Sequence, residues 1–148
     1  MAPTDPIARL NELIQGIELA ILTTVRPDSS LHSCPMAARA VDASGAFWLI
    51  TNVNSEKVEA VRATQRVNLC FTAAAANRYV SVSGFCELIR DRAKAKDLWL
   101  PDYQSWFPGG LEDPGLVLLK IVVQQAEYWD PSLARMVSLE GFDQAAIK

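Results

Sequence analysis

The feature of this sequence that most constrains its fold is a series of six β-rich segments joined by short, turn-forming stretches. One of them, Tyr79-Val80-Ser81-Val82-Ser83, alternates apolar and polar residues as a half-buried strand does. Strands and helices do not alternate strictly along the chain, so a parallel Rossmann-type sheet is not expected. The pattern instead predicts a mainly β protein, a small antiparallel barrel with short helices. The predicted strands cover residues 19–25, 31–41, 46–51, 67–72, 79–89 and 116–123, the last with an extension to about residue 129.

Three helices are predicted around these strands. The first covers residues 5–18, because Asp5 can cap it and apolar residues follow at spacings of three and four. Two shorter helices are expected between strands, one beginning after Ser55 and one after Asp91, since both side chains can accept hydrogen bonds from free helical amides. The stretch 102–115 contains two large aromatic residues and is predicted to be a loop.

Composition and charge limit the class of protein. The 148 residues carry 14 Lys+Arg and 17 Asp+Glu, a net charge of −3 that argues against an electrostatic nucleic-acid binder. We expect one domain over residues 1–148, with the barrel at about 19–130 and a C-terminal extension at 131–148. Hydrophobic residues make up 50% of the chain, which suggests a dimer. No apolar run approaches the roughly 20 residues of a membrane span, and no signal peptide is apparent, so a cytoplasmic location is expected.

The cysteines and the single histidine exclude several kinds of site. Cys34, Cys70 and Cys86 are odd in number and widely spaced, so the sequence predicts no zinc framework, redox pair or disulfide scaffold. Cys70 and Cys86 lie in predicted strands and are expected to be core thiols. His32 and Ser33 would point to opposite faces of a strand, whereas His32 and Cys34 share a face, so a Cys–His hydrolase remains an alternative. No phosphate-binding glycine loop or metal cluster is found, and no catalytic residue is assigned.

A series of short motifs carries a resemblance to a known family. The motifs are Leu22-Thr23-Thr24-Val25, His32-Ser33-Cys34-Pro35-Met36, Phe47-Trp48-Leu49-Ile50-Thr51, Ser55-Glu56-Lys57-Val58, Arg78-Tyr79-Val80-Ser81-Val82-Ser83-Gly84, Trp106-Phe107-Pro108-Gly109-Gly110 and Glu127-Tyr128-Trp129-Asp130. In its order and spacing this series resembles the pyridoxamine 5′-phosphate oxidase-like FMN-binding split-barrel family, and in particular its general stress protein branch. The resemblance extends over about residues 19–130.

The resemblance implies a homodimer of six-stranded antiparallel split β-barrels with FMN in each of two interface grooves. A helix start that offers amides, a hydroxyl and an ammonium group suits the FMN phosphate. From spacing alone, Lys57 is better explained as a solvated helix residue after a capping serine, and Tyr79 and Trp106 could each be core residues; it is the resemblance that favours cofactor contacts. By this resemblance, Ser55 and Lys57 would bind the phosphate, and Ile50 and Thr51 would contact the flavin. Ser33, Cys34, Pro35 and Met36 would lie beside the ring or the phosphate arm. Tyr79 would contact the cofactor from a strand, and Trp106 would approach the ring from the other subunit.

Cys34 departs from the family pattern, because relatives of this branch usually carry an arginine there that helps to hold the anionic cofactor. Losing one charge-assisted contact is expected to weaken FMN binding by about ten- to a hundredfold, unless Arg39 or Arg62 substitutes for it.

The C-terminal stretch bears on the reaction. Classical pyridoxamine phosphate oxidases have Arg and His there for the substrate's phosphate, whereas residues 132–148 offer only Arg135 and Lys148 as cations, so that activity is not expected. Two hypotheses remain. The first is an FMN-dependent oxidoreductase of stress metabolism that acts on an unidentified small molecule. The second is a flavin-binding or sensing protein without turnover.

Overall fold

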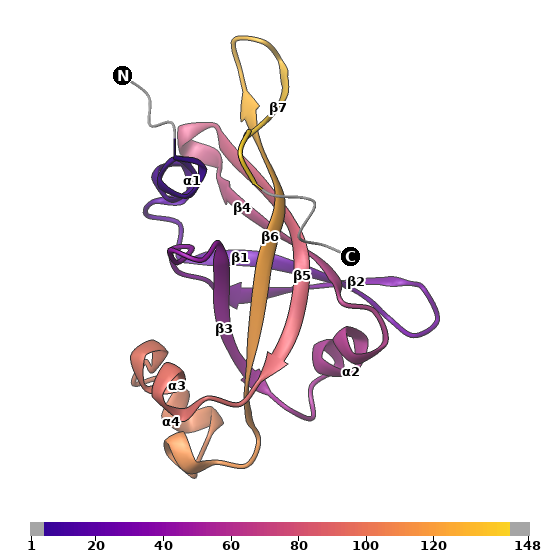
Figure 1. Ribbon diagram of the computed structural model, residues 1–148, viewed down its shortest axis with the longest axis vertical. Helices are drawn as coiled ribbons and strands as arrows, with labels where there is room; N and C mark the ends of the chain where they lie inside the picture. Colours follow the sequence, from indigo (N-terminus) through magenta and orange to yellow (C-terminus); the bar gives the residue numbers. More distant parts are fainter. Residues whose placement is uncertain (1–4, 143–148) are drawn as a thin grey trace.

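The computed structural model describes residues 5–142 and is built on one antiparallel sheet that curls into a half-barrel (Figure 1). The strand order is β2-β1-β4-β5-β6-β3, and β7 pairs with β6 outside this path. β2 and β3 are therefore the two edges of the curled sheet, and the split of the barrel lies between them. The strands are β1 (Leu19–Val25), β2 (Leu31–Ala37), β3 (Ala46–Asn52), β4 (Arg66–Ala73), β5 (Arg78–Ile89), β6 (Leu116–Asp130) and β7 (Arg135–Ser138).

Helices lie around the curled sheet, at the upper left, lower left and lower right of the view in Figure 1. The leading helix begins as expected, because the Asp5 carboxylate accepts a hydrogen bond from the Ile7 amide, and it buries Leu10 and Ile14. It ends at Ile14, earlier than the expected residue 18, because Gly16 adopts φ +85° and turns the chain toward β1. The helices are α1 (Pro6–Ile14), α2 (Glu56–Ala63), α3 (Arg92–Leu98) and α4 (Tyr103–Trp106), with 3₁₀ turns η1 (Ala74–Ala76) and η2 (Gly110–Glu112).

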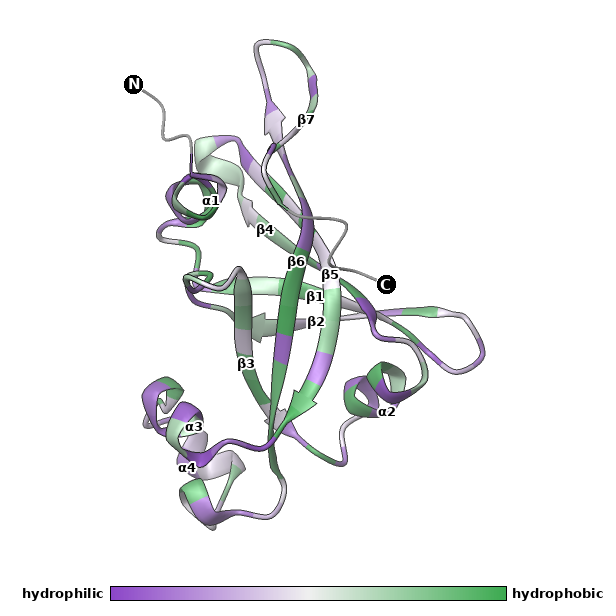
Figure 2. Cartoon of the chain, in the orientation of Figure 1, coloured by the Kyte–Doolittle hydropathy of each residue, from purple (hydrophilic) through white to green (hydrophobic). Residues whose placement is uncertain are grey.

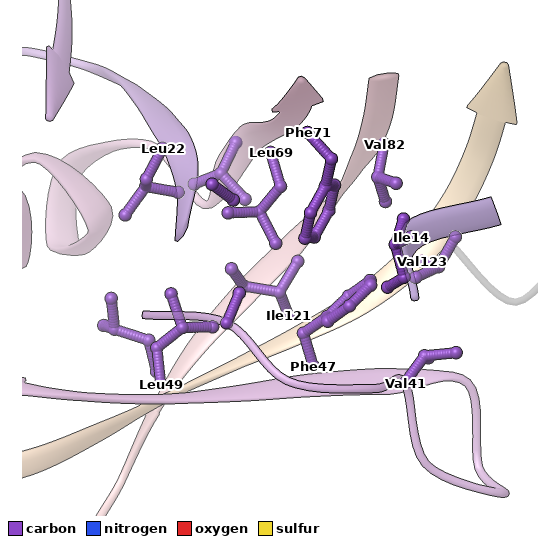
Figure 3. Close-up of a cluster of buried hydrophobic side chains, with 14 of the residues drawn as sticks. Ile14, Leu22, Val41, Phe47, Leu49, Leu69, Phe71, Val82, Ile121 and Val123 are labelled. Atoms are coloured by element: carbon purple, nitrogen blue, oxygen red, sulfur yellow. The ribbon is translucent and has the colours of Figure 1, made fainter. Parts of the chain in front are cut away.

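The main core fills the inside of the half-barrel. Phe47 and Phe71 are fully buried at its centre, with ring centroids 5.6 Å apart (Figure 3). Apolar residues of β6 run past them, and Figure 2 shows this strand as hydrophobic along its lower half and polar toward β7. A smaller cluster packs α3 and Phe107 against Ile50 and Leu118. Phe47 and Leu49 of β3 belong to the main core and Ile50 to the smaller cluster, so the two clusters pack on the two faces of this edge strand and fix the predicted site residues on it.

The split-barrel fold predicted from the sequence is confirmed, and three details differ. A seventh strand, β7, lies within the C-terminal extension predicted at 131–148, of which residues 143–148 fall outside the described part. The predicted loop 102–115 contains α4 and η2. The second predicted strand stops at Ala37 instead of residue 41, because Asn11 of α1 exchanges two hydrogen bonds with the backbone of Val41 and draws this segment onto the helix. Within residues 5–142, no helix is both long and apolar enough to cross a membrane.

Candidate functional site

Three of the predicted site residues meet where β3 ends and α2 begins. The Lys57 ammonium donates to the Thr51 hydroxyl at 3.4 Å, and the Thr51 and Ser55 hydroxyl oxygens lie 3.5 Å apart. Ser55 occupies the N-cap position, but its side chain makes no capping hydrogen bond. The first amides of α2, two hydroxyls and an ammonium group therefore converge at one point, which is a suitable environment for an anion such as phosphate.

Residues from the β1–β2 hairpin extend this cluster. The Arg26 guanidinium donates to the carboxylate of Glu56, the first residue of α2, and His32 Nε2 lies 3.7 Å from the other oxygen of that carboxylate. The hydrogen bond from Arg26 holds the pKa of Glu56 below its usual range. Arg26 and Glu56 were not predicted as site residues, because they are 30 positions apart and only the fold brings them together.

Two polar atoms beside this cluster have no hydrogen-bond partner within the described chain. They are Thr24 Oγ1 and His32 Nδ1, and Thr24 is only 1% exposed. Thr24 and His32 are direct partners in the β1–β2 register, so their side chains share one face of the sheet. Burying such atoms without a partner costs about 1–3 kcal/mol each, and a polar ligand nearby would remove that cost.

A cavity of about 1010 Å³ lies farther along the same two edge strands. β2 runs from the anion cluster, where its second residue, His32, lies beside Glu56, to the cavity, which its last residue, Ala37, lines. On β3, Trp48 and Ile50 line the cavity, whereas Thr51 points to the other face of the strand and meets Lys57. The cavity is mostly apolar, and its wall includes Ala37, Arg39, Trp48, Ile50, Leu98 and Tyr103.

Trp48 is held rigidly in the cavity wall. Its indole Nε1 donates to the Asp42 carboxylate at 2.8 Å, and the ammonium groups of Lys94 and Lys120 lie 4.8 and 5.4 Å from its ring centroid. Burial alone would raise the pKa of Asp42, but hydrogen bonds from Ser44, Trp48 and the Ala46 amide outweigh it and lower the pKa from 3.8 to about 2. Asp42 is therefore an anion at neutral pH and fixes the indole.

The four predicted site residues of β2 do not share one face. Cys34 lies opposite Leu22 and Met36 opposite Ala20, so both point inward, and Met36 packs against the core. Ser33 and Pro35 point to the outer face, where the Ser33 and Thr23 hydroxyls are 2.7 Å apart. Within residues 5–142, β2 pairs only with β1, so a ligand along the groove would meet its backbone edge more readily than all four side chains.

Neither arginine expected to replace the one missing at Cys34 lies in the anion cluster. The Arg39 guanidinium donates to the carbonyls of Asp97 and Leu98 at 3.5 and 3.4 Å, on the cavity side. Arg62 is exposed in the last turn of α2, at the opposite end of the helix from Ser55 and Lys57.

Tyr79 and Trp106 are not brought to the anion cluster within one subunit. Tyr79 lies half-buried near the start of β5, opposite Thr72. Trp106 ends α4, is 68% exposed, and its ring centroid lies 6.1 Å from that of Tyr103. Both assignments stay predictions. Among the cysteines, Cys86 is buried as expected, with its pKa raised by burial to about 12, whereas Cys70 is only half-buried on the outer face.

Comparison with known proteins identifies the family. Residues 5–148 match the family described as pyridoxamine 5′-phosphate oxidase like, which is nearly the whole chain. The chain belongs to this family. The family resemblance predicted from the sequence motifs is thereby confirmed.

Two solved structures have the same fold as this chain. The chain is similar to General Stress Protein 26 from Bacillus anthracis, with 24% identity, a TM-score of 0.75, and coverage of 94% of this chain and 100% of the other. It is also similar to the general stress FMN/FAD binding protein from Xanthomonas citri, with 22% identity, a TM-score of 0.71, and coverage of 95% and 97%. At these identities the two structures show a shared fold.

One curated relative is also similar in sequence. Protein bli-3 from Neurospora crassa is 26% identical over 102 residues, which cover 63% of this chain and 49% of the other. The chain therefore spans about half the length of this relative.

Proposed function

We propose that this member of the pyridoxamine 5′-phosphate oxidase-like family binds FMN and uses it in an oxidation or reduction of a small molecule. The observation that carries the proposal is that the anion cluster and a mostly apolar cavity of about 1010 Å³ adjoin on β3, where Ile50 lines the cavity and Thr51, the next residue, belongs to the cluster. A molecule with a phosphate at one end and a large flat ring at the other matches that arrangement. The FMN/FAD binding protein of Xanthomonas citri, which has the same fold, supports the flavin.

The residues present fit FMN in both charge and shape. Ser55, Thr51 and Lys57 would bind the phosphate, and the unsatisfied Thr24 and His32 atoms beside them indicate a polar ligand at this end. The β2 edge and Ile50 would orient the ring, while the fixed Trp48 side chain would limit access of water to it. FMN, when bound, supplies the hydride or electron transfer.

A steady-state assay tests the proposed activity. Consumption of NADH or NADPH is measured with the protein, with added FMN, and with a panel of small electron acceptors. Turnover above that of free FMN supports an oxidoreductase. Tight FMN binding with no turnover in any combination favours the second hypothesis, a flavin-binding or sensing protein.

The protein is further proposed to be a homodimer, because apolar side chains gather on one outer surface. Leu19, Ile21 and Leu31 of β1 and β2 are 60%, 42% and 68% exposed. Exposed apolar side chains of this kind, on a sheet face that also carries the Thr23 and Ser33 hydroxyls, are typical of an interface between subunits. A partner placed there would also lie beside β2, the strand that lines the proposed cofactor groove, and could contribute residues such as Trp106.

We expect sedimentation velocity at micromolar concentration to give a dimer of the 16.3 kDa chain. Ile21→Arg should produce a monomer, because it places a charge in the middle of the apolar surface. Leu133→Arg is the matched control, since Leu133 is also exposed, at 52%, but lies in the β6–β7 turn. A monomeric wild-type protein would contradict the dimer. If Leu133→Arg dissociates the dimer and Ile21→Arg does not, the interface lies at the β6–β7 hairpin instead.

A further inference from the structure

We propose that Arg26 is the arginine that binds the ligand's phosphate in this chain, and that Glu56 competes with the phosphate for it. The inference deepens the proposed function and rests on it for the identity of the ligand as a flavin phosphate. The phosphate contact itself can be tested without a flavin. Relatives usually carry a cofactor-binding arginine at position 34 of β2, where this chain has a cysteine. Arg26 of the β1–β2 hairpin would supply that positive charge instead.

The hairpin holds Arg26 in a defined place. Its amide donates to the Ser30 carbonyl and its carbonyl accepts from the Ser29 amide, both at 2.8 Å. The Asp28 carboxylate accepts from the Ser30 amide and hydroxyl at 2.9 and 2.6 Å and closes the turn. The backbone of Arg26 is thus fixed at the end of β1, and its side chain, one third exposed, extends to the first residue of α2.

Glu56 lies between the two residues that would bind the phosphate. It follows Ser55 and precedes Lys57, and its carboxylate takes the hydrogen bond from Arg26. A guanidinium group binds a carboxylate and a phosphate with the same planar set of donors, so the two anions compete for it. Phosphate carries more charge and also gains from Lys57 and the α2 amides, so it is expected to displace the carboxylate.

A second, independent observation places a polar ligand at this helix start. Thr24 is 1% exposed and its Oγ1 has no hydrogen-bond partner in the described part of the chain. It lies on β1, two residues before Arg26, and shares a sheet face with His32, whose Nε2 lies 3.7 Å from Glu56. α2 packs on β1 at this point. A buried hydroxyl with unused bonding capacity, on the strand that leads into Arg26, is expected at an anion site rather than at a simple surface ion pair.

Calorimetric titrations with FMN, riboflavin and inorganic phosphate test the inference, because riboflavin lacks the phosphate. Arg26→Gln should weaken the binding of FMN and of inorganic phosphate by about tenfold and leave the binding of riboflavin unchanged. Glu56→Gln should tighten the binding of FMN and of phosphate several-fold, because it removes the competing anion. In the double variant that gain should disappear, because it depends on Arg26. Arg62→Gln is the control, since it removes an exposed arginine of the same helix at its other end.

The outcomes separate this inference from the proposed function. If FMN binds but Arg26→Gln changes neither FMN nor phosphate affinity, the inference is wrong and the flavin function stands. If phosphate binds in an Arg26-dependent way while neither flavin binds, the flavin function is wrong and the phosphate contact stands. Weaker FMN binding in Glu56→Gln would show that Glu56 positions Arg26 instead of competing for it. An equal loss of phosphate affinity in Arg62→Gln would mean that the effect of Arg26→Gln reflects only the change in net charge, and would also overturn the inference.

Discussion

Lys57→Ala is expected to weaken FMN binding by about 10- to 100-fold, because it removes one charge-assisted contact to the phosphate. Lys57 belongs to the first turn of α2, and its ammonium group already points to Thr51 at the end of β3. Quenching of flavin fluorescence on binding gives the two dissociation constants. Riboflavin affinity should change far less than FMN affinity, and the loss should shrink as salt is raised, because part of it is electrostatic.

The matched control is Lys96→Ala, which removes an exposed lysine from the last turn of α3 and should leave FMN binding unchanged. Lys120 is not a suitable control, although it lies on a strand away from α2, because its ammonium group lies over the ring of Trp48 in the cavity wall. Equal losses from Lys57→Ala and Lys96→Ala would mean that the phosphate does not bind at the start of α2.

Gly84→Ala is expected to destabilise the protein by about 3 kcal/mol or more, which corresponds to a fall in melting temperature on the order of 10 °C. The register between β5 and β6 shifts between Ser83 and Gly84, and the two backbones approach closely there. A Cβ on Gly84 would lie 2.2 Å from the Val122 carbonyl oxygen and 3.0 Å from its carbon. Both are backbone atoms of the long central strand, so relief of the overlap requires the strands to separate.

Gly45→Ala is the control that separates the steric overlap at Gly84 from the cost of an unfavourable backbone conformation. Gly45 lies in the turn before β3 with φ +85°, and a Cβ there would meet nothing within 4 Å. The substitution should cost only about 1–2 kcal/mol for the left-handed backbone. Thermal unfolding followed by circular dichroism would measure both variants. A smaller loss for Gly84→Ala than for Gly45→Ala would mean that β5 and β6 do not approach as closely as described.

The sequence by itself determined the strands and the local part of the site. Strands such as β5 are recognisable from alternation, and the starts of α1 and α3 from Asp5 and Asp91, whose carboxylates accept hydrogen bonds from the first helical amides. One short turn joins Thr51, Ser55 and Lys57, so the sequence places them close together, whereas their roles come from the family resemblance, which assigns Ser55 and Lys57 to the phosphate and Thr51 to the flavin. Each of these features depends on interactions between residues close in the chain, so it can be predicted from a short stretch of sequence.

Only the tertiary structure decided which distant segments complete the site. Arg26 and Glu56 meet because β1 and α2 pack together, and no local pattern indicates that contact. The cavity exists because α1, the ends of β2 and β3, and the α3–α4 region surround one space. β7 was missed because Arg135–Ser138 has little strand pattern of its own and is ordered by pairing with β6. Such features depend on packing and register across many residues, where burial and hydrogen bonding outweigh local preference.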